Sequence, residues 1–473
     1  NFKGMIFNQS LGTMKVNSKE SKNERVNQLH HQHTLSHHHH MRIRWQEFFT
    51  SDNITPAKNA TLAERSVIVG HIGMMLLSCG TGAWRVRSAM NTIARCLDMT
   101  CSTDIGLVSI EYTCVDADGK SYTQALSLPS TGVNTTKLDR MENFVSQFKK
   151  DNGNWTIGQI HNRLEEISTM KSQYAPWQVG LAAGLACAGF IFLLGGGIFE
   201  VICAFLGAGC GNYIRRKMID RHLTILANIT VAVAVACAVY VGSFYLIRLF
   251  YPVSLHHLDG YIGAMLFVIP GFPFITSGLD ISKLDMRSGL ERMAYAIMII
   301  VVATAVGWVM ALILNLHPQN FEKLGLTPLV LTVLRLVASF CGVFGFSIMF
   351  NSRIPMATVA GISGAIANTL RLSLVDWSNV PPAVAAFIGA FVAGMLASII
   401  RRKTGFPRIA ITVPSIVIMV PGLYMYRAMF NLGLTSLNAG ALWMVQALMI
   451  VICLPLGLIA ARILMDKDWR HAG

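Results

Sequence analysis

Residues 177–194 read WQVGLAAGLACAGFIFLL, an apolar run without a charged side chain. A helix needs about 20 mainly apolar residues to cross the hydrocarbon core of a bilayer. Nine further candidates follow toward the C-terminus, with approximate edges at 198–214, 224–249, 261–280, 290–316, 327–350, 354–374, 382–400, 409–427 and 437–464. The pattern predicts a mainly α-helical polytopic membrane protein with ten transmembrane helices.

The charge density changes just before this run. Residues 1–175 carry 19 Lys or Arg and 15 Asp or Glu, whereas residues 176–473 carry 20 and 10. The whole chain is 53% hydrophobic and 14% charged, against about 25% charged in a soluble domain. This composition excludes a disordered chain, a fibrous protein and a simple soluble enzyme. We expect a polar domain over 41–175 and two membrane modules over 176–318 and 319–473.

Residues 1–40 are polar and contain LHHQHTLSHHHH. We expect this segment to be a flexible His-rich leader, or sequence upstream of a true start at Met41, although histidine-rich tracts can bind metal. The ten cysteines show no CxxC spacing, so we interpret them as reduced apolar residues. We therefore expect no structural metal and no cofactor.

The polar domain shows both helical and strand patterns. We predict helices over 62–79, 84–99, 137–149 and 156–170, and a β-hairpin of 104–115 with 121–128, which together form a small α+β domain. His71, Ser88, Cys96 and Asp98 could be assembled into a nucleophile–base set, but no local catalytic signature accompanies them. We expect a structural or regulatory domain and no enzyme, with a membrane-tethered hydrolase as an alternative.

The basic residues of the loops predict the orientation. An N-terminus in the cytoplasm places 15 Lys or Arg on the inside and three, Arg248, Lys323 and Arg427, on the outside. Cytoplasmic loops are enriched in basic residues, so we expect both termini in the cytoplasm. The net charge of +14 is then explained by topology and by contact with anionic lipids, without nucleic acid as a partner.

A weak internal repeat relates the two modules. Gly189-Phe190 recurs as Gly345-Phe346 at an offset of 156, and Pro270-Gly271 recurs as Pro421-Gly422 at an offset of 151. Five spans per half would invert the second half in the membrane. Inverted five-helix repeats with Pro/Gly-broken helices at matching positions are typical of secondary transporters. An opened helix exposes backbone groups that can bind a polar solute.

The predicted substrate- and ion-binding residues are those at the two breaks and polar groups within apolar helices: Pro270, Gly271, Phe272, Pro273, Thr276, Asp280, Arg335, Asn368, Arg371, Pro421, Gly422 and Tyr424. Asp280 is the candidate proton-titrating carboxylate, or else an interfacial residue that ends a helix. Arg335 could pair with a substrate carboxylate or with Glu200. Asn368 and Arg371 share a helix face, where helix–helix hydrogen bonding is the default interpretation.

Four segments resemble the threonine/serine exporter family. The run IPGFPFITSGLDISKLDMRSGLERM, residues 269–293, resembles the family signature, and GTGAWRVRSAMNTIARCLDM, residues 80–99, resembles its opening motif. FGFSIMFNSRIP from Phe344 and TVPSIVIMVPGLYMYRA from Thr412 resemble its smaller C-terminal module. The resemblance implies a fused two-module form, since the modules are separate polypeptides in some bacteria.

The resemblance also implies a function and a location. It implies proton-driven export of threonine or serine across a bacterial cytoplasmic (inner) membrane, with succinate as the alternative solute known from two-polypeptide relatives. By position, six residues match the first module's motif: Pro270, Gly271, Pro273, Asp280, Gly289 and Arg292. The expected partners are a small polar solute, protons and membrane lipids, and a homo-oligomer is left open.

Overall fold

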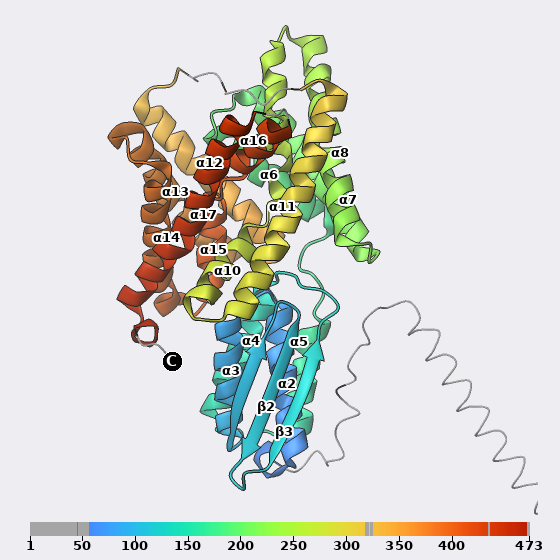
Figure 1. Ribbon diagram of the computed structural model, residues 1–473, viewed down its shortest axis with the longest axis vertical. Helices are drawn as coiled ribbons and strands as arrows, with labels where there is room; N and C mark the ends of the chain where they lie inside the picture. The colour runs from blue at the N-terminus through green and yellow to red at the C-terminus, as the bar shows by residue number, and fades with distance from the viewer. Residues whose placement is uncertain (1–44, 46–55, 317–320, 322–324, 434–435, 471–473) are drawn as a thin grey trace, which may run out of the picture.

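The computed structural model describes residues 45, 56–316, 321, 325–433 and 436–470. The leader expected over 1–40 lies outside these residues. The described chain forms a small sheet-containing domain and a larger helical bundle (Figure 1).

The polar domain is a three-stranded antiparallel sheet, in the order β1-β2-β3, with helices packed against it. Its elements are η2 (Ala57–Asn59), α2 (Leu62–Ser78), α3 (Ala83–Cys96), β1 (Met99–Ile105), β2 (Ser109–Asp116), β3 (Ser121–Ser127), α4 (Thr135–Lys150) and α5 (Ile157–Thr169). Helices α2 and α5 each begin with a reciprocal capping box, Thr61 with Glu64 and Thr156 with Gln159. These side chains satisfy amide groups that the start of a helix leaves unpaired.

The hairpin expected between 104–115 and 121–128 is present as β2 and β3, but the expected start of its first strand is wrong, because residues 104 and 105 belong to β1. The amide of Gly106 donates to the carbonyl of Ser109 at 2.8 Å to close the turn between β1 and β2. Strand β1 reads MTCSTDI, in which polar residues occupy both faces of the centre. Burial alternates along the strand, but only Met99 and Ile105 at its ends are fully buried, so its own sequence gives a weaker strand signal than its pairing with β2.

The bundle contains eight described helices that are long and apolar enough to span a membrane: α6 (Pro176–Leu193), α7 (Ile198–Asp220), α8 (Ile225–Phe250), α11 (Met286–Leu314), α12 (Pro328–Met349), α13 (Ile354–Ser378), α14 (Pro382–Thr404) and α17 (Leu437–Met465). Two bent pairs add up to two further spans. One pair joins η3 (Leu255–Gly260), α9 (Tyr261–Met265) and η4 (Leu266–Val268) to α10 (Gly271–Ser282), and the other joins α15 (Arg408–Val417) to α16 (Gly422–Gly433). The short η5 (Lys467–Trp469) follows α17.

The first helices of the two halves, α6 and α12, pack together. A methyl group on Gly189 would lie 2.5 Å from the carbonyl oxygen of Ala338, and one on Gly345 would lie 2.4 Å from that of Ala182. The Phe190 and Phe346 rings meet edge to face with their centroids 6.2 Å apart. Glycine at both positions therefore lets the two helix backbones approach closely.

The polar domain lies at one end of the bundle, below α10 and α15 in Figure 1, and α16 lies at the opposite end. The chain leaves α5 at Thr169 and enters α6 at Pro176. The domain contacts the bundle through the loop after α2, the start of α4 and the hairpin between β1 and β2. These contacts bring residues of both membrane modules against one small domain.

Candidate functional site

Both Pro-Gly pairs lie where a helix is interrupted. The axes of the flanking helices differ by 52° at the first pair and by 47° at the second. At each break the glycine amide donates to the carbonyl two residues earlier, Gly271 to Ile269 at 2.8 Å and Gly422 to Val420 at 2.9 Å. Proline supplies no amide hydrogen and clashes with the preceding turn, so α10 and α16 each start as a new helix.

The two breaks pack against each other in a reciprocal way. A methyl group on Gly271 would lie 3.3 Å from Val420, and one on Gly422 would lie 1.9 Å from Ile269. Val420 and Ile269 hold the same position in the repeat, at the offset of 151. The breaks are therefore adjacent in space, although about 150 residues separate them in the sequence.

The remaining first-module residues of the predicted site are occupied by protein contacts. The Phe272 side chain is buried and meets the Phe350 ring edge to face at 5.3 Å. Pro273 is half-buried. The Thr276 hydroxyl donates to the carbonyl oxygens of Phe272 at 3.0 Å and Pro273 at 3.2 Å. The Thr276 hydroxyl therefore supplies hydrogen bonds to carbonyl groups near the break, as hydroxyl side chains do in interrupted membrane helices.

A cavity of about 360 Å³ adjoins the second break. Four residues of the predicted site line it, Arg371, Pro421, Gly422 and Tyr424. The other lining residues are Phe190, Leu193, Leu194, Phe321, Leu372, Pro382, Ile418, Met419, Val420, Leu423, Arg427, Trp443 and Ile450. They include the last turn of α6 and the first residue of α14, so the cavity lies in the half of the bundle remote from the polar domain.

The polar chemistry of the cavity is cationic and aromatic. The Arg427 guanidinium lies 4.9 Å from the centroid of the Trp443 ring, which Tyr424 meets edge to face at 5.2 Å. The Nε–H of Arg371 is buried and has no hydrogen-bond partner among the described residues. The described lining contains two guanidinium groups and no carboxylate. Such a lining, at the start of a helix, suits a carboxylate ligand.

Arg335 has a partner that the sequence did not indicate. Its Nη2 lies 2.5 Å from Oδ2 of Asp376, so α12 and α13 are joined by an ion pair. The alternative partner Glu200 instead contacts His257, with Oε1 and Nδ1 2.5 Å apart. The alternative in which Arg335 pairs with Glu200 is therefore wrong, because Asp376 pairs with Arg335 and Glu200 contacts His257.

Asn368 fits the default interpretation of a polar residue within a membrane helix. Its Nδ2 donates to Oγ of Ser339 at 2.9 Å, which joins α13 to α12, and its side chain is fully buried. Arg371, one turn further along α13, lines the cavity. The two residues expected to share a face therefore have different surroundings.

Asp280 lies at the junction of the bundle and the polar domain. Its Oδ1 accepts a hydrogen bond from the Ala83 amide at 3.0 Å, and its Oδ2 accepts one from Ser288 Oγ at 2.9 Å. Arg292 Nε lies 3.2 Å from the same Oδ2. Asp280 and Arg292 are almost completely buried. The carboxylate thus caps the first turn of α3 from another domain, where the helix dipole favours a negative charge.

The loop Gly80-Thr81-Gly82 completes this junction. Arg292 donates to the carbonyl oxygens of Gly80 at 3.3 Å and Thr81 at 2.8 Å. A methyl group on Gly82 would lie 2.5 Å from Asp280 Oδ1. Glycine at position 82 is therefore required for the close approach of the Asp280 carboxylate to α3.

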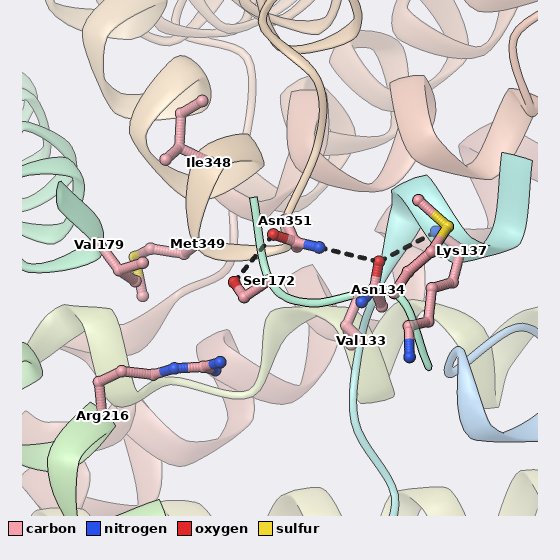
Figure 2. Close-up of a pocket in the computed structure, with 10 residues that line it drawn as sticks. Val133, Asn134, Lys137, Ser172, Val179, Arg216, Ile348, Met349 and Asn351 are labelled. Atoms are coloured by element: carbon pink, nitrogen blue, oxygen red, sulfur yellow. Dashed lines mark hydrogen bonds between the residues drawn. The ribbon is translucent and has the colours of Figure 1, made fainter. Parts of the chain in front are cut away.

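A second, polar cavity of about 220 Å³ lies where α4 meets the α12–α13 loop (Figure 2). Asn351 lies between Ser172 and Asn134: Asn351 Oδ1 accepts from Ser172 Oγ at 3.1 Å, and its Nδ2 donates to Asn134 Oδ1 at 3.1 Å. The Thr135 hydroxyl contacts Ser352 Oγ at 2.7 Å. The polar domain is thus bonded to the second module as well as to the first.

The nucleophile–base set considered for the polar domain is not assembled. His71 is buried and stacks between Trp45, at 4.1 Å between ring centroids, and His161, at 5.5 Å. Burial, together with the neighbouring His161, lowers the pKa of His71 to about 3. Ser88 and Asp98 lie on the surface, and Asp98 is 3.6 Å from Lys58. His71, Ser88 and Asp98 therefore do not form the nucleophile–base set that the hydrolase alternative considered.

Two family models match the chain in sequence order. The model described as "Putative threonine/serine exporter" matches residues 67–315, and the model described as "Threonine/Serine exporter, ThrE" matches residues 335–464. The chain belongs to the threonine/serine exporter family. The two matches fit a fused form, as the sequence motifs indicated, and both family descriptions name a transporter.

Curated relatives carry names of the same kind. A "Probable succinate transporter subunit YjjP" of Escherichia coli is 27% identical over 51% of this chain and 90% of its own length. A "Probable threonine/serine exporter" of Mycobacterium tuberculosis is 22% identical over 78% of this chain and 70% of its own length. A "Pheromone-regulated membrane protein 10" of Debaryomyces hansenii is 23% identical over 56% of this chain and 27% of its own length. No solved structure matches the chain.

Arg427 and Trp443, which interact with each other beside the cavity, were not among the site residues predicted from the sequence. Arg427 was assigned to an outside loop, but it is almost completely buried within α16 and lines the cavity. Trp443 lies within the apolar run of α17, and nothing in the sequence distinguishes it there as a binding-site residue. The repeat offset could have indicated Arg427, because it is equivalent to Thr276 of the predicted site.

Proposed function

We propose that this member of the family is a secondary active exporter of small amino acids of the threonine and serine class. The observation that carries the proposal is the cavity beside Gly422, where Arg371 and Arg427 meet the start of α16. Every amino acid carries a carboxylate, and both guanidinium groups and helix N-termini bind carboxylates. The indole of Trp443 and the phenol of Tyr424 would cover the apolar part of the solute.

We infer that the membrane part comprises ten spans as two inverted five-helix repeats, over 176–318 and 319–473, after a domain over 41–175. Two pairs of reciprocal contacts support this arrangement. Gly189 and Gly345 each contact an alanine of the other module, and the two alanines are equivalent in the repeat. Gly271 and Gly422 each contact an apolar residue at the other break, and these two residues are also equivalent. In an interface with two-fold symmetry, if residue i of one half contacts residue j of the other, then residue j of the first half also contacts residue i of the second.

We place both termini in the cytoplasm of a bacterial cell, with the protein in the inner membrane. The excess of basic residues in loops on the side of the polar domain supports this orientation. The polar domain then closes the cytoplasmic end, because it is bonded to α11 of the first module through Arg292 and to the α12–α13 loop of the second through Asn351. The cavity lies in the opposite half, as expected for a carrier in an outward-facing state.

We propose proton coupling through Asp280. Protonation would remove the negative charge that Arg292 and the first turn of α3 face. The polar domain would then be held less tightly against α10, whose first residue is Gly271 at the break. These two steps would couple proton uptake to opening of the cytoplasmic side. The proton and the solute would not need to share one site.

A second candidate solute is a dicarboxylate of the succinate type. The described lining of the cavity contains two cationic groups and no carboxylate that would receive an α-ammonium group. A solute with two carboxylates would use both arginines. The Escherichia coli relative named as a succinate transporter subunit points to the same solute class.

Counterflow in proteoliposomes tests both candidates. Vesicles loaded with unlabelled threonine, serine or succinate should take up the matching labelled solute through the wild-type protein. We expect Arg371→Gln and Arg427→Gln each to raise the half-saturation concentration about tenfold or more, since a hydrogen bond to a charged group contributes about 1.5–3 kcal/mol. Arg248→Gln, at an exposed arginine on α8, is the matched control. Unchanged half-saturation in both cavity variants would refute this site.

A further inference from the structure

A cationic cluster surrounds the cytoplasmic end of α17, outside the cavity described above. Arg462, in the last turn of α17, is 2% exposed. Its guanidinium lies 5.0 Å from the Trp84 ring centroid and 4.5 Å from that of Trp469. The two indoles meet edge to face at 5.4 Å. Arg462 is therefore enclosed between the polar domain, which supplies Trp84, and the C-terminal segment.

The hydrogen-bond donors of this cluster exceed its acceptors. Nη1 and Nη2 of Arg462 are buried and have no hydrogen-bond partner among the described residues. The same is true of Nε1 of Trp84, Nε of Arg85 and Nε of Arg408. Buried polar groups in folded proteins are nearly always hydrogen-bonded. Five unsatisfied donors in one region, all from side chains that cannot accept, indicate a missing acceptor.

The charges of the cluster lead to the same conclusion. Arg85, Arg401 and Arg408 all lie close enough to Arg462 to repel it. The described carboxylates that pair within the cluster are Glu142, which contacts Arg85, and Asp466, which contacts Arg408 through both oxygens. Arg401 is exposed, so three largely buried guanidinium groups, those of Arg85, Arg408 and Arg462, face two carboxylates among the side chains that the structure describes. An uncompensated buried charge costs several kcal/mol, so a bound anion would stabilise this junction.

We propose that the Arg462 cluster, defined as Trp84, Arg85, Arg408, Arg462 and Trp469, binds an oxyanion of the phosphate class. The three planar guanidinium groups suit the tetrahedral oxygens of a phosphate, which accept several hydrogen bonds at once. The phosphate belongs either to an anionic lipid or to a free ion. Ile463 and Leu464, the next residues of α17, are exposed apolar side chains, so a lipid can reach the cluster from the bundle surface.

The site also joins two parts of the molecule. Trp84 and Arg85 belong to α3 of the polar domain, whereas Arg408 and Arg462 belong to α15 and α17 of the second module. A phosphate that bonds to both would favour the docked position of the polar domain. This consequence does not depend on the identity of the transported solute.

Thermal unfolding of the full-length protein tests the proposal. One arm adds inorganic phosphate to protein in an uncharged detergent at constant ionic strength. The other arm compares phosphatidylcholine nanodiscs with and without phosphatidylglycerol. We expect a saturable rise in the melting temperature in at least one arm. A response to phosphate alone would identify a free ion, and a response to phosphatidylglycerol alone would identify a lipid headgroup.

Matched variants locate the effect. Arg462→Gln should weaken the response about tenfold or more in apparent affinity, because it removes the positive charge that strengthens hydrogen bonds to an anion. Arg402→Gln, at an exposed arginine on the same side, should respond within about twofold of wild type. If Arg462→Gln does not fold, Trp84→Phe keeps the ring, removes the Nε1–H donor and should weaken the response about threefold or more.

Three results would overturn the proposal. The first is a wild-type protein that responds to neither probe. The second is a response that does not saturate. The third is a folded Arg462→Gln variant, or in its place Trp84→Phe, with the same apparent affinity as wild type.

Discussion

Asp280 accepts a hydrogen bond from the backbone amide of Ala83 at 3.0 Å, and the two residues are 197 positions apart in the sequence. This bond places a carboxylate of a broken membrane helix on the first turn of a helix in the polar domain. It joins α10, which begins at the first helix break, to the polar domain. Any movement of α10 must therefore either carry the polar domain along or break this contact.

Replacement of Asp280 by Asn should weaken the attachment of the polar domain to the helical bundle. The variant leaves the Arg292 guanidinium buried without its carboxylate partner, and breaking a buried ion pair costs about 3–5 kcal/mol. We expect a lower melting temperature, faster proteolysis between α5 and α6, and loss of gradient-dependent efflux. Asp220→Asn, at an exposed residue ending α7, is the control. Efflux that still follows the proton gradient in Asp280→Asn would exclude this residue as the proton carrier.

Gly82→Ala should disturb the same junction by steric overlap alone. The added methyl group would lie 2.5 Å from Asp280 Oδ1, and overpacking of this kind costs about 1–3 kcal/mol. The melting temperature should fall, whereas Gly132→Ala, with open space around it, should leave it unchanged. Equal melting temperatures for the two variants would show that the junction tolerates a methyl group.

Gly422→Ala should separate the two breaks. The new methyl group would lie 1.9 Å from Ile269 Cδ1, so α16 must shift and the cavity beside it must change shape. We expect counterflow to fall about tenfold or more, since small displacements in a binding site have large effects on rate. Gly242→Ala, a site on α8 with no atom within 4 Å of the added methyl, should transport normally. Wild-type counterflow in Gly422→Ala would exclude tight packing of the breaks as a requirement.

The buried histidines predict a dependence of stability on pH. Burial lowers the pKa of His71 to about 3, with a contribution from His161, and lowers the pKa of His161 to about 4. The unfolded chain takes up protons below about pH 6.5 and the folded chain does not. Stability is therefore complete above that pH and falls as the pH drops toward 4, by at most about 1.4 kcal/mol per unit for each histidine.

Replacement of His71 by Phe tests this dependence. The variant should show a shallower fall of melting temperature between pH 7 and pH 5 than the wild type, because one of the two titrating groups is absent. His256→Phe, at an exposed residue, should retain the wild-type slope. A slope unchanged by His71→Phe would mean that this histidine is protonated in the folded state.

The helical elements of the bundle could be predicted from the sequence, because each apolar run is long enough to be recognised on its own. The run 177–194 corresponds to α6, and the two Pro-Gly pairs lie at the bends of the two broken helices. Strand β1 was not predicted, because only the two ends of its inward face are fully buried and its pairing with β2 defines it.

The site was predictable only in part for a similar reason. Pro421, Gly422 and Tyr424 were found because a helix-breaking pair is visible in the sequence, and they do line the cavity. Asp280 was also visible as a charge in an apolar helix, but its partners Ala83 and Arg292 could be identified only from the packing of two domains.

The sequence by itself determined the membrane class, the polar domain, the family and the positions of the helix breaks. These properties follow from local composition and from short motifs, which do not depend on distant residues. Only the tertiary structure decided that the two breaks meet, that Arg371 and Arg427 share a cavity, and that Arg462 is enclosed between Trp84 and Trp469. The physical reason is that burial, charge pairing and unsatisfied donors arise from contacts between segments far apart in the chain.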